Sequence, residues 1–334
     1  MDACCVLGDV VYCVVAAKDK GASEIADKVG VVLGELGVEY AQEYDGSSMI
    51  FACGDDAFIL SVFRELGARQ VPVLGIGGGV LSEANPGNYE DVVKRVVCGE
   101  FAVVEKARLV AQFGGRMSPF ALNEIGIFPR RSAELMRYTL GIDNEYFFRD
   151  TADGVIVSTP TGSTGYAMSV GGPMVIGDAD VFTVTPVSSM RRSYAPIVVS
   201  SGARIRISGL EAKSSVCAVV DGVVRIVVDC DCVEIVRCSC PALFVKPKNS
   251  QSIVERLRKR SVEVNHAKVR SLSPSAKLVY KVLSFEGEMT QKEIVARSYL
   301  PQRTVRYALE VLSSAGVIQR RASLLDIRQT VYSV

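Results

Sequence analysis

DGVIVSTPTGSTGYAMSVGGP, residues 153–173, divides into two parts of different composition. Residues 154–159 are rich in β-branched side chains, which is typical of a strand. The second part places glycines and hydroxyls around Tyr166, and we expect a tight turn followed by an element at 164–169 with unpaired backbone N–H groups. Glycines let a ligand approach the backbone, hydroxyls bond ribose or phosphate, and an aromatic ring can cover a base. The stretch therefore predicts a nucleotide-binding site.

Three short apolar runs precede this stretch, at residues 10–17, 49–52 and 71–76. Runs of this length are typical of buried parallel strands. The second run ends in Cys53-Gly54-Asp55-Asp56, and the spacing of a helix follows it. Strand, glycine-containing loop and helix in succession predict an open α/β sheet, in which ligands bind beyond the carboxyl ends of the strands. We expect Asp55 at that edge.

From about residue 99 the pattern changes to short alternating segments separated by turns, which predict a β-rich second domain. The segment at 102–112 is expected to form one such strand. A chain of 334 residues is too long for one ordinary domain. We expect four parts: an α/β domain at 1–98, a β-rich domain at 99–248, a basic connector at 249–271 and a small C-terminal domain at 272–334.

Charge divides the chain in the same way. Residues 251–334 hold 15 Lys and Arg against 7 Asp and Glu, a net charge of +8, whereas the other 250 residues hold 23 against 30, a net charge of −7. The near-neutral whole, with a formal net charge of +1, therefore hides a basic C-terminal part joined to an acidic body.

The C-terminal part has the signals of a winged helix-turn-helix domain. Ser273-Pro274 opens one helix, Thr290 to Glu293 is a capping box for a second, and residues 301–315 have the apolar spacing of a third. A hairpin is expected from residues 317–321 and 327–334. The third helix carries the candidate DNA-contacting side chains on its polar face, which are Gln302, Arg303, Arg306 and Tyr307. The alternative is a dimerisation or packing module whose basic face is only solvated.

Several other classes of protein are disfavoured. The N-terminus lacks the basic region of a signal peptide and no apolar run is long enough to span a membrane, so we expect a cytoplasmic protein. The single histidine, His266, lies in the connector and is expected to be solvated, which excludes His-based triads and His-rich metal sites. Four cysteines, at 230, 232, 238 and 240, are expected on one strand and too widely spaced to share a zinc ion.

Residues 1–248 resemble the NAD kinase family in three motifs that occur in the family's order. Cys53-Gly54-Asp55-Asp56 stands where the family has GGDG, Asn123-Glu124 lies in ALNEIGIF, and residues 153–173 follow the family's pattern nearly throughout. The chain looks like an archaeal type of NAD kinase with a fused C-terminal domain similar to archaeal winged-helix regulators. The resemblance implies an α/β domain and a β-rich domain whose last strands return to the first domain.

The resemblance also implies transfer of the γ-phosphoryl group of ATP to the adenosine 2′-hydroxyl of NAD, with Mg²⁺. Asp55 would accept the hydroxyl proton, and Asn123 and Glu124 would bind the nucleoside. The dinucleotide site would be lined, partly across a subunit interface, by Asp153, Thr164, Gly165, Tyr166, Ala167, Met168 and Ser169. Asp56, which replaces a glycine of the family motif, is a further candidate cofactor-binding residue, and in the kinase hypothesis Asp55 and Asp56 share the metal ion. Family members are usually dimers or tetramers, so we expect a homo-oligomer.

The departures from the family pattern concern the half of the site that would hold the phosphoryl donor, which is ATP or polyphosphate. The first glycine of the family motif is Cys53 here and the last is Asp56. A second carboxylate brings negative charge toward a polyphosphate and should weaken its binding unless Mg²⁺ bridges the pair. Thr151 and Ala195 stand where many relatives have basic residues.

Two functions remain open, together with a plainly structural alternative. The first is a divergent NAD kinase with a DNA-binding regulatory domain. The second is a transcription regulator whose kinase-like body senses NAD(P) and does not bind ATP. A kinase for another substrate, such as a glycerolipid or sphingosine, is disfavoured by STPTGSTGY. The structural alternative is that Asp55 and Asp56 only cap the following helix and that Asn123 and Glu124 are only polar strand residues.

Overall fold

The computed structural model describes residues 10–177, 179–191, 195–248, 269, 272–286, 288–322 and 330–333. The chain forms two compact units, Met1–Ile253 and Val254–Val334. No helix among the described residues is both long enough and apolar enough to cross a membrane.

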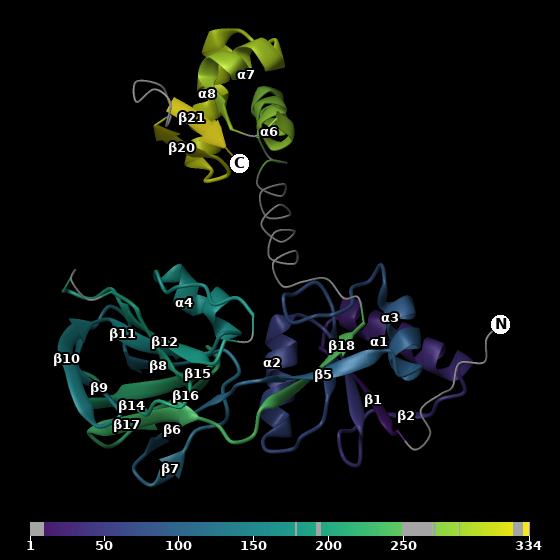
Figure 1. Cartoon of the computed structure of the whole chain (residues 1–334), viewed down its shortest axis with the longest axis vertical. Coiled ribbons are helices and arrows are strands. Elements are labelled where there is room, and N and C mark those ends of the chain that lie inside the picture. Colours follow the sequence, from purple (N-terminus) through teal and green to yellow (C-terminus); the bar gives the residue numbers. More distant parts are fainter. Residues whose placement is uncertain are drawn as a thin grey trace. The chain divides into compact units, whose positions relative to one another are not determined.

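The N-terminal part of the first unit is a sheet covered by helices on both faces (Figure 1). Its centre is three parallel strands, β1 (Tyr12–Ala16), β3 (Met49–Cys53) and β4 (Val73–Ile76), with β2 (Tyr40–Ala41) at one edge. Alternate strand residues face opposite ways. One set packs against α1 (Lys20–Glu35) and α3 (Tyr89–Val97), and the other packs against α2 (Asp56–Leu66).

Two antiparallel strands complete this sheet from further along the chain. They are β5 (Phe101–Lys106) and β18 (Ala242–Pro247). β18 also pairs with β4 in parallel, through Phe244 and Val73, so it lies between β4 and β5. β5 thus belongs to the first sheet although it follows the boundary expected at residue 98.

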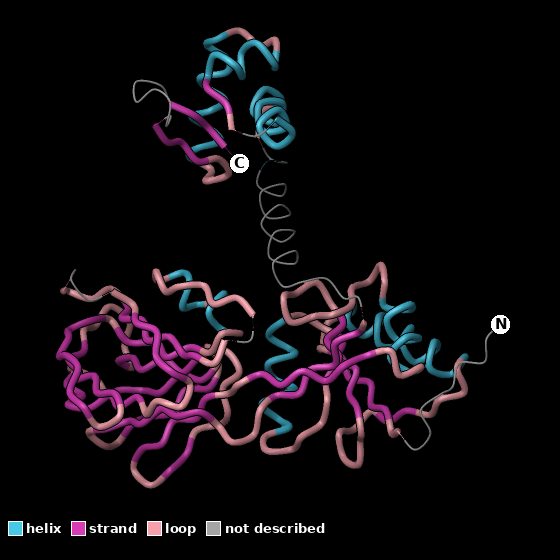
Figure 2. The backbone as a smooth tube through the Cα atoms, viewed as in Figure 1, coloured by secondary structure: helices cyan, strands magenta, loops and turns pink. Residues whose placement is uncertain are grey.

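The rest of the first unit consists of two packed six-stranded sheets, and Figure 2 shows it as almost entirely strand and loop. Their facing side chains form one continuous core. The first sheet contains β10 (Glu145–Ala152), β9 (Met136–Ile142), β14 (Ile205–Glu211), β17 (Cys232–Arg237), β6 (Leu109–Phe113) and β7 (Arg116–Met117). The second contains β13 (Ile197–Ser200), β12 (Val181–Val187), β11 (Gly154–Ser158), β8 (Glu124–Pro129), β15 (Val216–Val220) and β16 (Val224–Val228).

The single strand expected at 102–112 is wrong, because the chain leaves one sheet and enters another at Arg108. β5 ends at Lys106 in the first sheet, and β6 begins at Leu109 in the β-rich part. Arg108 is 1% exposed and donates hydrogen bonds to the carbonyl oxygens of Cys240 (2.7 Å) and Phe63 (3.3 Å). The chain passes between the two parts of this unit at Arg108, between β5 and β6, and again at Cys240, between β17 and β18. The Arg108 guanidinium therefore links both of these segments to α2.

The cysteine-rich segment also departs from a single strand. β17 contains only Cys232 of the four cysteines, and Cys238 and Cys240 follow its end, where the Cys240 backbone N–H donates to the Cys238 sulfur. All four are free thiols. Among the residues described here, no group of three or more His, Cys, Asp and Glu is placed to hold a metal ion.

The second unit consists of three helices and a three-stranded sheet. The order along the chain is α6 (Pro274–Glu286), β19 (Met289–Thr290), α7 (Gln291–Ser298), α8 (Gln302–Ser314), β20 (Gln319–Ala322) and β21 (Thr330–Ser333). The capping box expected at Thr290 and Glu293 is present. The connector expected at 249–271, with His266, lies outside the described residues except for Val269, which packs in the core of this unit.

Candidate functional site

The stretch 153–173 and the pair Asn123-Glu124 meet at the end of β11. The Thr159 hydroxyl donates to the carbonyl oxygen of Leu122 (2.6 Å), and the Thr159 backbone N–H donates to that of Asn123 (2.9 Å). The chain then forms a 3₁₀ turn at Gly162–Thr164 and a one-turn helix, α4, at Tyr166–Ser169. A Cβ at Gly162 would overlap the backbone of Asn123, so only glycine allows this contact.

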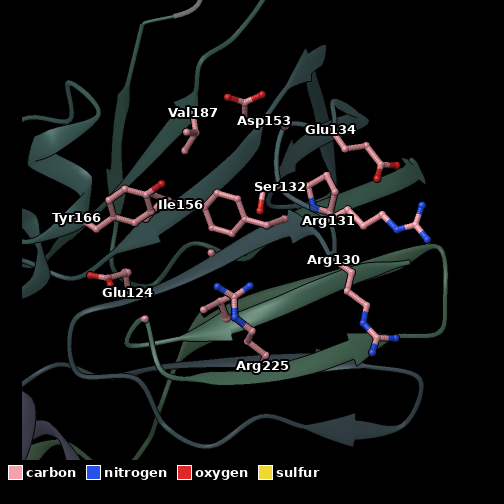
Figure 3. A pocket seen from close by; sticks show the side chains of 16 residues that line it. Glu124, Arg130, Arg131, Ser132, Glu134, Asp153, Ile156, Tyr166, Val187 and Arg225 are labelled. Carbon is pink, nitrogen blue, oxygen red and sulfur yellow. The ribbon is translucent and has the colours of Figure 1, made fainter. Parts of the chain in front are cut away.

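A cavity of about 510 Å³ opens beside this junction. Three residues singled out from the sequence line it, namely Glu124, Asp153 and Tyr166 (Figure 3). They come from the start of β8, the residue before β11 and the start of α4. Three separate segments of the sequence therefore contribute to one pocket, which is large enough for part of a dinucleotide.

Aromatic rings form one wall of the pocket. A Cβ at either Gly126 or Gly154 would overlap the ring of Phe128, so the two glycines let this ring lie against the backbone of two adjacent strands. The Tyr166 ring lies beside it, with 6.2 Å between the ring centroids and 26° between the planes. Tyr166 is 45% exposed. The arrangement offers a flat surface on which a planar heterocycle can stack.

Asp221 fixes the backbone that carries Asn123 and Glu124. It lies in the turn between β15 and β16, where Asp221 and Gly222 both have positive φ, of 47° and 71°. Its carboxylate accepts the backbone N–H groups of three consecutive residues, at 3.2 Å from Leu122, 2.8 Å from Asn123 and 3.3 Å from Glu124. This buried carboxylate therefore orients the start of β8 toward the pocket.

Burial perturbs both carboxyl groups of this pair. Desolvation, followed by the nearby Asp221 charge, raises the pKa of Glu124 from 4.5 to about 7. Burial also raises the pKa of Asp221. The three backbone N–H donors act in the opposite direction and lower this pKa, but burial is the larger effect. Glu124 is 6% exposed, and its Oε2 has no hydrogen-bond partner among the described residues. A buried carboxyl oxygen without a partner is well suited to bind a ligand hydroxyl.

Three arginines, Arg130, Arg131 and Arg225, line the other end of the pocket. In the view of Figure 3 the guanidinium of Arg225 lies nearer to Glu124 than those of Arg130 and Arg131 do. No ion pair of Arg130 or Arg225 is found in the part of the chain that the structure describes. The pocket thus combines a hydroxyl-binding carboxyl, a stacking surface and cationic groups that can pair with phosphates.

The other predicted residues of this stretch contribute less to the pocket. Thr164 bonds locally to the carbonyl oxygen of Thr161 (3.4 Å) and Ser169 to that of Tyr166 (2.8 Å). Ala167 is 0% exposed and packs with Ile156 and Val187, which leaves only its backbone available. Met168 is exposed and does not line this cavity, whereas the backbone of Gly165 lies beside the side chains of Asn123 and Glu124.

Asp55 and Asp56 occupy different positions at the carboxyl end of β3. Asp55 is exposed and caps α2 by accepting the backbone N–H of Phe58 at 2.9 Å. Asp56 turns toward the loop after β4, where its two oxygens accept the backbone N–H groups of Val80 (3.0 Å) and Leu81 (2.9 Å). This geometry differs from the shared metal site expected from the sequence.

Cys53, the other departure in this motif, does not face the loop. It ends β3 with its side chain in the core beneath α1 and α3. Burial raises the pKa of this thiol to about 12. The thiol is therefore a small apolar core group.

The Asp55 loop and the pocket are connected through α2. Leu122, the residue before Asn123, packs in one cluster with Ile59 and Phe63 of this helix. Arg64, from the same helix, lowers the pKa of Asp221 by its charge. The two predicted halves of the site are thus held by adjoining parts of one packed unit.

The four residues proposed for DNA contact lie together on α8. Gln302, Arg303, Arg306 and Tyr307 are all exposed, whereas Val305, Ala308, Leu309 and Leu312 of the same helix are buried. The helix therefore has one apolar face against its own unit and one free polar face.

Sequence reasoning missed three groups that line the pocket, namely Phe128, the arginine pair 130–131 and Arg225, and it missed Asp221, which holds the backbone of the pocket residue Glu124. Asp221-Gly222 between two strands is also the ordinary sequence of a hairpin turn. Its carboxylate bonds residues almost 100 positions away, with a sequence separation of 98 for Asn123. The charged residues at 130–131 carry no pattern that separates a ligand contact from a solvated surface.

Comparison with known proteins identifies the family. Residues 122–247 match a protein-family model described as the ATP-NAD kinase C-terminal domain. The chain is 33% identical over 222 residues to an NAD kinase of Methanothermobacter thermautotrophicus, covering 60% of this chain and 78% of that protein. It is 36% identical over 162 residues to an NAD kinase of Methanopyrus kandleri, covering 48% of this chain and 59% of that protein.

Two solved structures resemble the fold. A crystal structure of an NAD kinase from Archaeoglobus fulgidus in complex with ATP has a TM-score of 0.63 and 29% identity, covering 79% of this chain and all of that chain. A yeast NADH kinase with NADH has the same TM-score at 19% identity and shows the fold alone, covering 73% of this chain and 85% of that chain. The expected α/β part followed by a β-rich part is confirmed. The chain belongs to the NAD kinase family.

Proposed function

We propose that this protein transfers the γ-phosphoryl group of ATP to the adenosine 2′-hydroxyl of NAD. The observation that carries the proposal is the pocket in which the buried Glu124, Asp153 and the Phe128–Tyr166 wall come together. The segment that carries Glu124 is linked through Leu122 to α2, the helix that Asp55 caps. Membership of the NAD kinase family supports the same reaction.

Different residues of the pocket bind different parts of NAD. A planar base stacks on Phe128 and Tyr166, and Glu124 and Asp153 accept hydrogen bonds from hydroxyls. Arg130, Arg131 and Arg225 pair with the negatively charged phosphates. Asn123 orients the nucleoside from the same backbone segment, which Asp221 holds in place.

In the transfer itself, the 2′-oxygen of the adenosine forms a bond to the γ-phosphorus as the bond from that phosphorus to the ADP oxygen breaks. The Asp55 carboxylate accepts the proton released by the 2′-hydroxyl. Mg²⁺, when bound, would supply charge neutralisation for the phosphates. Of the two neighbouring carboxylates Asp55 would hold it, because both oxygens of Asp56 bond the backbone. Phosphoryl transfer depends mainly on positioning and charge, so a single carboxylate suffices.

The test is formation of NADP⁺ from NAD⁺ by the purified full chain with Mg²⁺, with ATP in one series and polyphosphate in another. Asp55→Asn should lower the rate by about 10²–10⁴-fold while NAD⁺ affinity stays within about twofold. Asp27→Asn, which removes an exposed carboxylate from α1, is the matched control. Absence of product with both donors would contradict the kinase function.

A second function is favoured by the position of Asp56. Its carboxylate occupies backbone N–H groups that could otherwise face a phosphate. In this alternative the body senses NAD(P) without transferring phosphate. The outcome that selects it is measurable NAD(P)H binding by the full chain together with no product and no ATP binding.

We further propose that the second unit is a winged helix-turn-helix that binds DNA. The support is the order of its elements, three helices followed by the paired strands β20 and β21, and the exposed polar face of α8. Arg303→Ala combined with Arg306→Ala should weaken salt-dependent DNA binding at least about tenfold, whereas Lys277→Ala on α6 should have little effect. Complete absence of DNA binding by the intact protein would refute this part.

The assembly and location follow as proposals from the same family. We propose a cytoplasmic homo-oligomer, which light scattering of the purified full chain tests. A monomeric mass across the micromolar range would overturn the oligomer.

A further inference from the structure

Two cysteines, Cys238 and Cys240, come together in the segment between β17 and β18. Both are free thiols, and the chain bends between them at Ser239. The Cys240 backbone N–H donates to the Cys238 sulfur at 3.3 Å, and the two thiols lie within hydrogen-bonding reach of each other. The bend therefore already brings both sulfur atoms to one place.

Arg108 holds the backbone on both sides of this bend. The Cys238 backbone N–H donates to the Arg108 carbonyl oxygen at 2.7 Å, and the Arg108 guanidinium donates to the Cys240 carbonyl oxygen at 2.7 Å. One residue further on, the Gln70 side-chain amide donates to the carbonyl oxygen of Pro241 at 3.1 Å. Because the backbone is fixed in this way, a bond between the two sulfurs requires little further ordering of the chain.

The same arginine places a positive charge beside the thiols. Its guanidinium is buried, its Nη2 has no hydrogen-bond partner and no carboxylate forms an ion pair with it among the residues that the structure describes. Burial lowers the pKa of Arg108, and negative charge on the two cysteines, followed by Asp221, acts in the opposite direction. A buried cation of this kind favours the thiolate form of a neighbouring cysteine.

The two thiols differ in their access to solvent. Cys238 is 5% exposed, and burial raises the pKa of its thiol more than the Arg108 charge lowers it. Cys240 is partly exposed. A dissolved oxidant therefore meets Cys240 first, and Cys238 stays protected beneath it. One reachable thiol next to a second, resolving thiol is the arrangement of reversible redox sites.

We propose that Cys238 and Cys240 form a reversible redox site, which a small hydroperoxide converts into a disulfide in the segment that joins the β-rich part to the first sheet. This site is separate from the NAD pocket and from the Asp55 loop. The proposal is independent of the kinase function.

The reaction with hydrogen peroxide has two steps. The Cys240 thiolate attacks one peroxide oxygen, the O–O bond breaks, and the leaving oxygen takes up a proton and departs as water, which leaves Cys240 as a sulfenic acid. The Cys238 sulfur then attacks the Cys240 sulfur, the S–O bond breaks, and the hydroxyl leaves as water with the proton of the Cys238 thiol. One peroxide is thus reduced as two thiols are oxidised to one disulfide, and thiol exchange with an added dithiol reverses the change.

A second pair of cysteines with the same spacing provides an internal comparison. The Cys230 thiol donates to the Cys232 carbonyl oxygen at 3.1 Å, whereas the Cys232 sulfur accepts the Nε–H of Arg206 at 3.1 Å. The two sulfurs of this pair therefore contact different partners. We expect the pair at 230 and 232 to form a disulfide far more slowly.

The experiment exposes the full chain to hydrogen peroxide, alkylates the remaining thiols and identifies tryptic peptides by mass spectrometry. The peptide 238–248 contains only Cys238 and Cys240, because the Lys246–Pro247 bond resists trypsin, and the peptide 226–237 contains only Cys230 and Cys232. Peptide 238–248 should become two hydrogen atoms lighter than its dithiol form, unalkylated, at least about tenfold faster than peptide 226–237. Dithiothreitol should restore both thiols.

Two variants separate the roles of the sulfurs. Cys238→Ser should leave Cys240 as a sulfenic acid that dimedone traps, whereas Cys240→Ser should slow oxidation of position 238 at least about tenfold. Equal oxidation rates of the two peptides would overturn the inference. So would conversion of peptide 238–248 mainly to sulfinic or sulfonic acids, or its linkage to another peptide. The wild-type digest decides the matter even if a variant does not fold.

Discussion

Glu124→Gln should change how the stability of the body depends on pH. The Glu124 carboxyl is buried beside Asp221, and its pKa rises from 4.5 to about 7 on folding. The folded protein thus holds this proton more tightly than the unfolded chain does. Stability from this group is complete below about pH 4.5 and is lost as the pH rises to about 7.

The size of the effect follows from the two pKa values. The difference between 4.5 and about 7 corresponds to about 3 kcal/mol of unfolding free energy. Glutamine has nearly the same shape and cannot ionise. The stability of Glu124→Gln relative to the wild type should therefore increase by about 3 kcal/mol between about pH 4.5 and pH 8.

The assay is urea unfolding followed by circular dichroism at several pH values, since the chain has no tryptophan. Any loss of packing caused by glutamine is independent of pH, so it does not affect how the difference in unfolding free energy between the two proteins changes with pH. Glu145→Gln, at an exposed position of β10, controls for loss of one carboxyl. If the unfolding free energies of the wild type and Glu124→Gln changed with pH in the same way, the raised pKa of Glu124 in the folded protein would be refuted.

Three further predictions follow from the same geometry. Asp221→Asn puts an amide N–H against at least one of the three backbone N–H groups that donate to the carboxylate. It should therefore lower the unfolding free energy by about 2–4 kcal/mol and weaken NAD⁺ binding, and equal denaturant midpoints of the variant and the wild type would contradict this. Gly162→Ala overlaps the Asn123 backbone and should cost at least about 2 kcal/mol in thermal unfolding, whereas a variant as stable as the wild type would show that the turn adapts. Arg225→Ala should raise the dissociation constant of NAD⁺ by about tenfold at low salt, measured by calorimetry, with Lys246→Ala as a control; no change would remove Arg225 from the phosphate-binding group.

Local sequence patterns predicted the elements that carry the site. The β-branched run before Thr159 forms β11, the capping box at Thr290 begins α7, and the apolar spacing after Pro301 forms α8. Of the larger set of residues that the family resemblance indicated, Glu124, Asp153 and Tyr166 line one pocket. The strand, cap and helix signals are readable because these preferences act over a few neighbouring residues.

Long-range contacts could not be predicted in this way. The alternating pattern of the sequence runs through Arg108, but the strand is interrupted there. The cause is a distant contact, since the Arg108 guanidinium bonds the carbonyl of Cys240, 132 positions away. The Asp55-Asp56 pair illustrates the same limit at a smaller scale. The two neighbouring carboxylates have the same chemistry, and only the loop at residues 79–81 decides that Asp56 turns away from the edge that Asp55 faces.

The most direct test of the kinase function is transfer of label from γ-³²P-ATP to NAD⁺ by the purified full chain. The geometry predicts labelled NADP⁺ with the phosphate on the adenosine ribose, formed by the wild type and reduced by about 10²–10⁴-fold in Asp55→Asn. Labelled NADP⁺ formed equally by Asp55→Asn would contradict the role of Asp55. No labelled NADP⁺ from the wild type, at NAD⁺ concentrations that saturate its pocket, would contradict the kinase itself.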